Sequence, residues 1–110
     1  MKHQHLSRIA LSLEGTTEVP HGERRAFRTR TIYATLAPDS RTANIKLGRD
    51  EQEHWCALLG EGLSPVPNKW GLQGWTCMAL DLLEEGEIET LVRLAWAGTQ
   101  RPNRKTRKGA

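Results

Sequence analysis

The spacing of apolar residues changes along this chain, and that change limits the fold more than any other feature. In segment 6–13 the apolar residues lie three and four positions apart, as on one side of a helix. In segment 43–47 they occupy every second position, as in a strand with one buried face. Segment 84–97 returns to the helical spacing. The chain therefore has to combine helices with a sheet.

Glycine and proline residues separate these segments and set the expected order as helix, strands, helix, strands, helix. We expect helices at residues 6–13, 50–59 and 84–97, with Gly98 ending the last one, strands at 16–22, 26–36, 43–47, 61–66 and 75–80, and a loop at 68–74. This order predicts an α+β fold with helices packed on an antiparallel sheet. A chain of 110 residues holds one domain of ordinary size, placed here at residues 1–98. Residues 99–110 contain no large apolar side chain and are expected to form a disordered basic tail.

Residues 26–36 are rich in β-branched and aromatic residues, and their alternation predicts two faces. It sends Phe27 and Thr29 to one face and Arg28 and Arg30 to the other; after a bend, Ile32, Ala34 and Leu36 face the core, with Tyr33 and Thr35 opposite. Ile45, Trp55 and Trp96 lie on the apolar sides of their segments. We therefore expect these three side chains to be buried together.

The formal net charge of +3 hides an uneven distribution of charge. Residues 1–49 carry nine Lys/Arg and four Asp/Glu, whereas residues 50–98 carry two and nine. The last twelve residues carry five Lys/Arg and no acid. The basic character is therefore concentrated in the first half and in the tail, which indicates local patches that could meet an anionic partner.

Arginine residues cluster at the start of the predicted sheet and suggest a nucleic-acid-binding face. The candidate residues are Arg24, Arg25, Arg28, Arg30, Tyr33 and Lys46, with Asn44 beside them, and Arg101, Arg104, Lys105, Arg107 and Lys108 in the tail. Arginine forks match phosphate oxygens, and an aromatic ring among them can stack on a base. The alternative is a solvated face whose charges keep a sheet edge from aggregating, with a tail that only aids solubility.

Other residues that carry chemistry show no catalytic arrangement. Cys56 and Cys77 sit in apolar runs and are interpreted as reduced core thiols, which favours a cytoplasmic location. The four histidines lack metal-ligand spacing, no serine has the context of a nucleophile, and no glycine loop could hold a phosphate. We therefore expect no enzyme activity, metal or cofactor. Trp70 and Trp75 flank a glycine loop and are interpreted as core anchors, with a ligand-binding loop as the alternative.

Four segments of the chain resemble the MmcQ/YjbR-like family. They are residues 27–36 (FRTRTIYATL), Ile45-Lys46-Leu47 before Asp50-Glu51-Gln52, residues 65–76 with the pattern Pro-x-x-x-x-Trp-Gly-x-x-Gly-Trp-Thr, and Leu94-Ala95-Trp96 in the final helix. The resemblance extends over residues 6–98. This chain departs from the family at Thr29-Arg30-Thr31, where members often carry glycine.

The resemblance implies an α-β(3)-α-β(2)-α fold, similar to that of secretion-chaperone-like domains, and the family's label of DNA-binding protein. It supplies no catalytic residues. Together with the arginine cluster, it favours a cytoplasmic protein that binds DNA or another nucleic acid with weak sequence preference. The alternative is a protein-interaction or chaperone-like module with a protein partner and no nucleic-acid ligand. The chain contains no apolar run long enough to span a membrane, so we expect no membrane partner.

Overall fold

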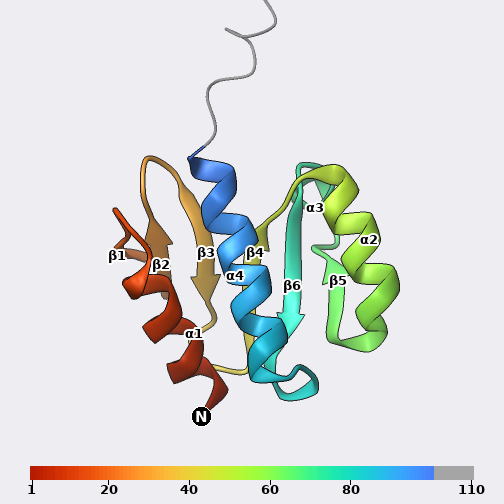
Figure 1. Cartoon of the computed structure of the whole chain (residues 1–110), viewed down its shortest axis with the longest axis horizontal. Helices are drawn as coiled ribbons and strands as arrows, with labels where there is room; N and C mark the ends of the chain where they lie inside the picture. The colour runs from red at the N-terminus through yellow and green to blue at the C-terminus, as the bar shows by residue number, and fades with distance from the viewer. Residues whose placement is uncertain (101–110) are drawn as a thin grey trace, which may run out of the picture.

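The computed structural model describes residues 1–100, in which four α-helices accompany one six-stranded sheet (Figure 1). In chain order the elements are α1 (Lys2–Ser12), β1 (Thr17–His21), β2 (Arg24–Arg28), β3 (Ile32–Leu36), β4 (Thr42–Lys46), α2 (Arg49–Leu59), β5 (Leu63–Pro65), α3 (Lys69–Leu72), β6 (Trp75–Ala79) and α4 (Glu85–Thr99). Single 3₁₀ turns at Gly60–Gly62 and Leu80–Leu82 join helices to strands. The α+β fold predicted from the sequence is confirmed.

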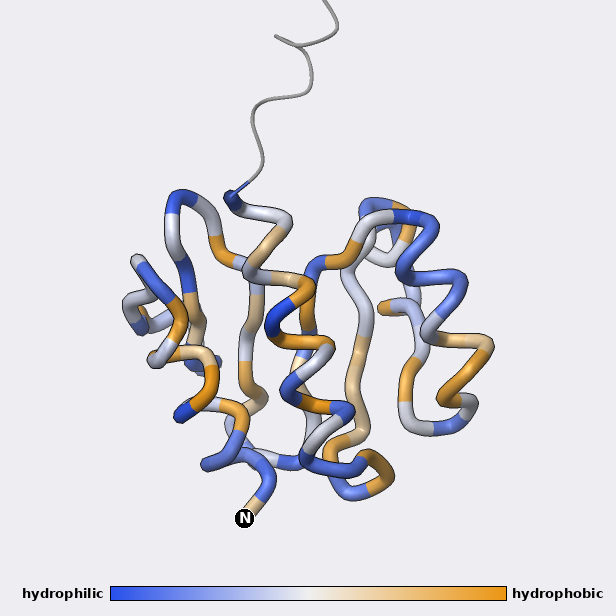
Figure 2. The backbone as a smooth tube through the Cα atoms, in the orientation of Figure 1, coloured by the Kyte–Doolittle hydropathy of each residue, from blue (hydrophilic) through white to orange (hydrophobic). Residues whose placement is uncertain are grey.

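The strands lie side by side in the order β1-β2-β3-β4-β6-β5, and every neighbouring pair is antiparallel. Figure 1 shows the three long helices, α1, α4 and α2, in front of the sheet. We call the side of the sheet that these helices cover the helix face and its other side the open face. Along each helix, apolar residues recur between polar ones, as Figure 2 shows. This pattern lets each helix bury one side against the sheet while the other side stays in water.

Two details differ from the implied α-β(3)-α-β(2)-α order. Four strands, and not three, precede α2: the expected strand at 16–22 forms the edge strand β1, and the single strand expected at 26–36 is divided into β2 and β3. The predicted loop between the last two strands contains the short helix α3, whose N-cap Asn68 accepts a hydrogen bond from the Trp70 amide at 2.8 Å. At the other end of the domain, α4 continues through Gly98 to Thr99.

The two helices that flank the second half of the sheet begin with matching carboxylate caps. The amide of Gly48 donates to Glu51 Oε1 at 3.1 Å, and the amide of Glu84 donates to Glu87 Oε1 at 2.9 Å. Each carboxylate satisfies a backbone donor that the helix leaves unpaired and lies near the positive end of the helix dipole. Acidic residues after Leu47 and before Ile88 therefore specify where α2 and α4 start.

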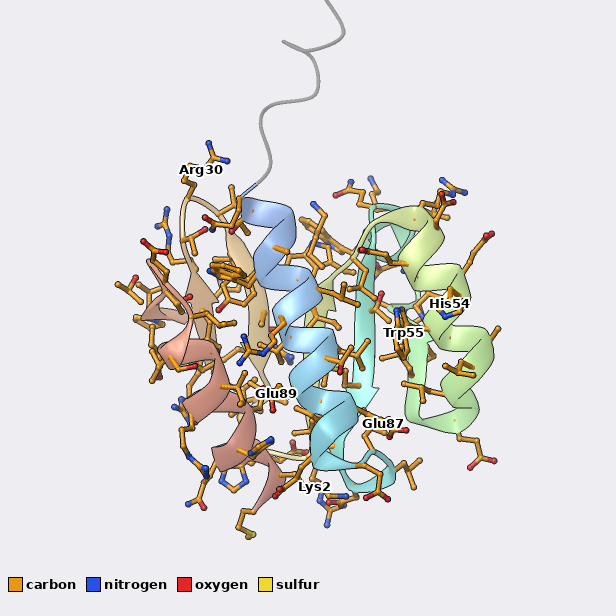
Figure 3. All side chains as sticks on the ribbon, viewed as in Figure 1. Lys2, Arg30, His54, Trp55, Glu87 and Glu89 are labelled. Carbon is orange, nitrogen blue, oxygen red and sulfur yellow. The ribbon has the colours of Figure 1, made fainter. Side chains whose placement is uncertain are left out.

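The core lies between the helix face and the helices. Its fully buried members include Leu6 of α1, Phe27 of β2, Ile45 of β4 and Leu91 of α4. Trp55 and Trp96 pack against the core but are only half-buried at its margin. Of the three side chains expected to be buried together, only Ile45 is fully buried. Figure 3 shows Trp55 extending from α2 toward the sheet. The indole of Trp96 donates to the Glu14 carbonyl at 2.9 Å, which holds the end of α4 against the end of α1.

A β-bulge in β3 reverses the predicted orientation of two side chains. Phe27 pairs with Ala34, but Arg28 pairs with Ile32, so Tyr33 is an extra residue in the ladder. The bulge turns Tyr33 to the helix face and Ile32 to the open face, whereas strict alternation predicts the reverse. Tyr33 is fully buried. The interpretation of Tyr33 as a base-stacking residue is therefore wrong.

The buried Tyr33 hydroxyl links the sheet to α1. It lies 2.9 Å from Thr16 Oγ1 and donates to the Ala10 carbonyl at 3.4 Å. Burial raises the pKa of this phenol above its ordinary value, against a smaller opposing effect of the Thr16 hydrogen bond. The phenol therefore stays neutral, and its hydrogen bonds help to hold α1 against the sheet.

Within residues 1–100, no helix is long and apolar enough to cross a membrane.

Candidate nucleic-acid interface

The open face carries positive charge and no carboxylate among its strand residues. Because directly paired residues of neighbouring strands share a face, the registers assign its members. They are Thr17, Val19 and His21 of β1; Arg24, Ala26 and Arg28 of β2; Ile32 and Thr35 of β3; Thr42, Asn44 and Lys46 of β4; Trp75, Cys77 and Ala79 of β6; and Ser64 of β5. Three cations and one histidine thus share the face with an indole ring.

A cavity of about 280 Å³ opens on this face. It is lined by His21, Arg24, Ile32, Thr35, Asn44, Val66, Trp70 and Trp75. The polar lining comes from β1, β2, β3 and β4, whereas the two indoles come from α3 and β6. The cavity therefore has one polar wall and one aromatic wall.

Arg24 lines the cavity and carries a donor without a partner. Its Nε donates to Thr35 Oγ1 at 2.9 Å, which fixes the orientation of the guanidinium. Its Nη2 is buried and has no hydrogen-bond partner among the described residues. A buried donor without a partner is costly, so such a group is commonly completed by water or a ligand acceptor. The arrangement suits a ligand with an oxygen or an unprotonated ring nitrogen.

Trp70 and Trp75 form the aromatic wall of the cavity. Trp70 is 55% exposed, so its interpretation as a core anchor is wrong. Trp75 is half-buried, and Lys46 Nζ lies 6.0 Å from the centre of its ring, within the range of a cation–π contact. Both rings are therefore available on the surface that carries the cations.

The glycines between the two tryptophans, and not the indole rings, make the tight contacts. Gly71 packs against the backbone of Val66, and Gly74 packs against the backbone of Leu47 with a φ of +107°. The Gly74 carbonyl accepts a hydrogen bond from the Leu47 amide at 2.9 Å. The backbone thus passes close to β4 and to the end of β5, and this path leaves the two indoles on the outside.

The structure divides the arginines that the sequence groups together. Arg24, Arg28 and Lys46 lie on the open face, and Arg28 Nη2 donates to the Arg30 carbonyl at 2.9 Å. Arg30 lies in the turn after β2 at one end of the molecule (Figure 3), where its Nη2 donates to the Thr99 carbonyl at 2.8 Å. The predicted binding residues in the tail, Arg101, Arg104, Lys105, Arg107 and Lys108, lie outside the described residues.

Arg25 belongs to the helix face, which makes its predicted place in the binding face wrong. Its Nε and Nη2 donate to the two carboxylate oxygens of Glu18 at 2.7 and 3.0 Å, and its guanidinium lies 5.8 Å from the centre of the Phe27 ring. The paired guanidinium lowers the pKa of Glu18, and the same pairing raises the pKa of Arg25. Strand alternation separates Arg25 from its neighbour Arg24.

Both cysteines are free thiols, but only one lies toward the core. Cys56 of α2 is half-buried against the core, and burial raises its pKa. Cys77 is half-buried on the open face; burial raises its pKa, and the positive charge of Arg24 opposes this effect. Both thiols therefore remain protonated at neutral pH.

No group of three or more His, Cys, Asp or Glu within residues 1–100 could hold a metal ion.

Several residues that line the cavity are not among the binding residues predicted from the sequence. Ile32 is hidden by the bulge, and His21, Thr35 and Val66 have no chemical signal of their own. Besides the predicted Arg24 and Asn44, Trp70 and Trp75 carry a signal that could identify the site, because aromatic residues around a glycine loop often contact ligands.

Comparisons with known proteins place the fold. No family model matches the sequence, and no curated protein matches it. The crystal structure of Deinococcus radiodurans protein DR2400, which contains a DUF419 domain, superposes with a TM-score of 0.67. The match covers 83% of this chain and 72% of that chain at 19% sequence identity. This chain has the fold of the MmcQ/YjbR family. DUF419 is that family, so the YjbR-like fold implied by the sequence motifs is confirmed.

Proposed function

We propose that this YjbR-like protein binds single-stranded nucleic acid on the open face of its sheet. The observation that carries the proposal is the combination of Arg28 and Lys46 with Trp70 and Trp75 on a face without acidic strand residues. Proteins that bind single strands combine a cationic surface for the backbone with aromatic rings for the bases. The DNA-binding label implied by the family resemblance points to the same class of ligand.

Single strands fit this face better than a double helix does. The exposed ring of Trp70 needs an unpaired base to stack on, and a duplex keeps its bases inside the stack. Residues 1–98 carry eleven Lys/Arg (nine plus two) and thirteen Asp/Glu (four plus nine), so their net charge is −2. Attraction to phosphate must therefore come from the local charge of the open face and from the tail. In this proposal the chain acts as a binding protein and not as an enzyme.

The dependence of binding on salt should reveal how many phosphates the protein contacts. Arg28, Lys46 and the five cations of the tail make seven candidate contacts (two plus five). At about −0.7 per contact for a single strand, log affinity should fall with log salt at a slope of about −5. Removal of residues 101–110 should reduce the slope to about −1.5. Fluorescence anisotropy with a labelled single strand measures both slopes.

The tail truncation also separates charge from recognition. Phosphate contacts position a protein without reading bases, so the truncated protein should keep any base preference of the full chain. If the full chain binds no single strand at about 50 μM protein and about 50 mM salt, where weak nonspecific binders are detected, the proposal is refuted. A protein-interaction module would then be the better explanation of the exposed tryptophan.

A further inference from the structure

We infer that the cavity on the open face is a base pocket that prefers guanine. This inference rests on the proposed function and adds a base preference to it. The cavity of about 280 Å³ is just smaller than typical small-molecule sites, whose range begins at roughly 300 Å³. It has room for a single planar base, with the sugar and phosphates outside among the cations of the open face.

The polar wall selects the edge of the base. Arg24 lines the cavity and is held through Nε by Thr35, and its Nη2 has no hydrogen-bond partner among the described residues. A guanidinium fork matches the adjacent O6 and N7 acceptors of guanine. Adenine and cytosine would instead turn an amino donor toward these donors, and thymine offers one carbonyl there. Guanine is therefore the base whose edge matches the Arg24 guanidinium.

The side chain of Asn44 can complete the recognition from the neighbouring strand. Asn44 pairs with Thr35 across β3 and β4, which places it next to the residue that anchors Arg24. Its amide carries an acceptor as well as a donor, and guanine presents N–H groups on the edge adjoining O6. Within residues 1–100, no hydrogen bond engages the Asn44 side chain, so its amide is available to a base.

The apolar wall provides the stacking surface. The indoles of Trp70 and Trp75 and the aliphatic side chains of Ile32 and Val66 make up the apolar part of the lining. Base–aromatic stacking tolerates every base, because each has a flat π surface. Stacking thus supplies affinity without selection, and the preference must come from Arg24 and Asn44.

The test compares single strands that differ in one base. The full chain is titrated with oligo-dC of about twelve nucleotides, within the range that such surfaces cover, carrying guanine, adenine, thymine or 7-deazaguanine at its centre. The guanine strand should bind about tenfold more tightly than the adenine strand, as one bidentate contact allows. The 7-deazaguanine strand lacks N7 and should lose most of this advantage. Equal affinity for guanine and 7-deazaguanine would overturn the inference without any protein variant.

A protein variant with unchanged charge provides the second arm. Arg24→Lys keeps the positive charge but lacks the planar fork, so it should retain binding to oligo-dC and lose the preference for guanine. Arg25→Lys, on the adjacent residue but the helix face, should leave the preference intact. If all strands bind equally well to the wild type, the base pocket is refuted while the proposed function stands. If no strand binds, both are refuted.

Discussion

Replacing Gly74 with alanine is expected to destabilise the protein by about 3 kcal/mol or more. A Cβ at this position would overlap the Leu47 carbonyl oxygen, and the φ of +107° is one that residues with side chains rarely adopt. The Leu47 backbone directly follows β4 and cannot move without disturbing the Leu47–Gly74 hydrogen bond. Urea denaturation followed by circular dichroism measures the change in the free energy of unfolding.

Gly98→Ala is the matched control for this substitution. Gly98 lies inside α4, and a Cβ there meets no atom within 4 Å. Alanine has the higher helix propensity, so this change should stabilise the protein by up to about 1 kcal/mol. A Gly74→Ala protein as stable as the wild type would show that the loop between Trp70 and Trp75 does not follow the path described. The aromatic wall of the cavity would then lose its structural basis.

Removing two cations from the open face should weaken binding to single strands about thirtyfold. Arg28→Ala and Lys46→Ala together remove two phosphate contacts, each of about 1 kcal/mol for charges near 4 Å in water. Both side chains are exposed, and neither forms an ion pair among the described residues. The double variant should therefore fold normally. Anisotropy at low salt measures the loss of affinity.

The double variant Arg25→Ala with Arg93→Ala controls for net charge. It removes the same two charges, but Arg25 lies on the helix face and Arg93 on the exposed side of α4. Both are paired with exposed glutamates, and such surface pairs contribute little to stability. This variant should bind within a few fold of the wild type. Equal losses in the two double variants would mean that binding follows net charge and not the open face.

The sequence predicts the order of the elements well because hydrophobic spacing and helix starts are local signals. The clean alternation around Ile45 identifies β4, and Glu51 and Glu87 mark where α2 and α4 begin. Strand alternation also predicts that the adjacent residues Arg24 and Arg25 lie on opposite faces of the sheet, as the structure shows. Grouping them by proximity along the chain overlooks that division.

The candidate site is harder to predict because two nonlocal features create it. The bulge at Tyr33 depends on how β2 and β3 pair, and it moves that ring from the open face to the core. The glycine loop passes so close to Val66 and Leu47 that its backbone fills the space a tryptophan anchor would need. Composition does not show whether the backbone or an indole ring makes the close contact. The three-dimensional path of the loop decides it.

The indole N–H signals of the four tryptophans test the central claim most directly. Trp70 and Trp75 line the cavity on the open face. Trp55 packs toward the core, and Trp96 donates a hydrogen bond to the Glu14 carbonyl, so both lie on the helix face. In a ¹⁵N-labelled sample titrated with a single strand, the account predicts that the signals of Trp70 and Trp75 shift while those of Trp55 and Trp96 stay in place. Shifts confined to Trp55 and Trp96 would place the ligand on the helix face and contradict the account.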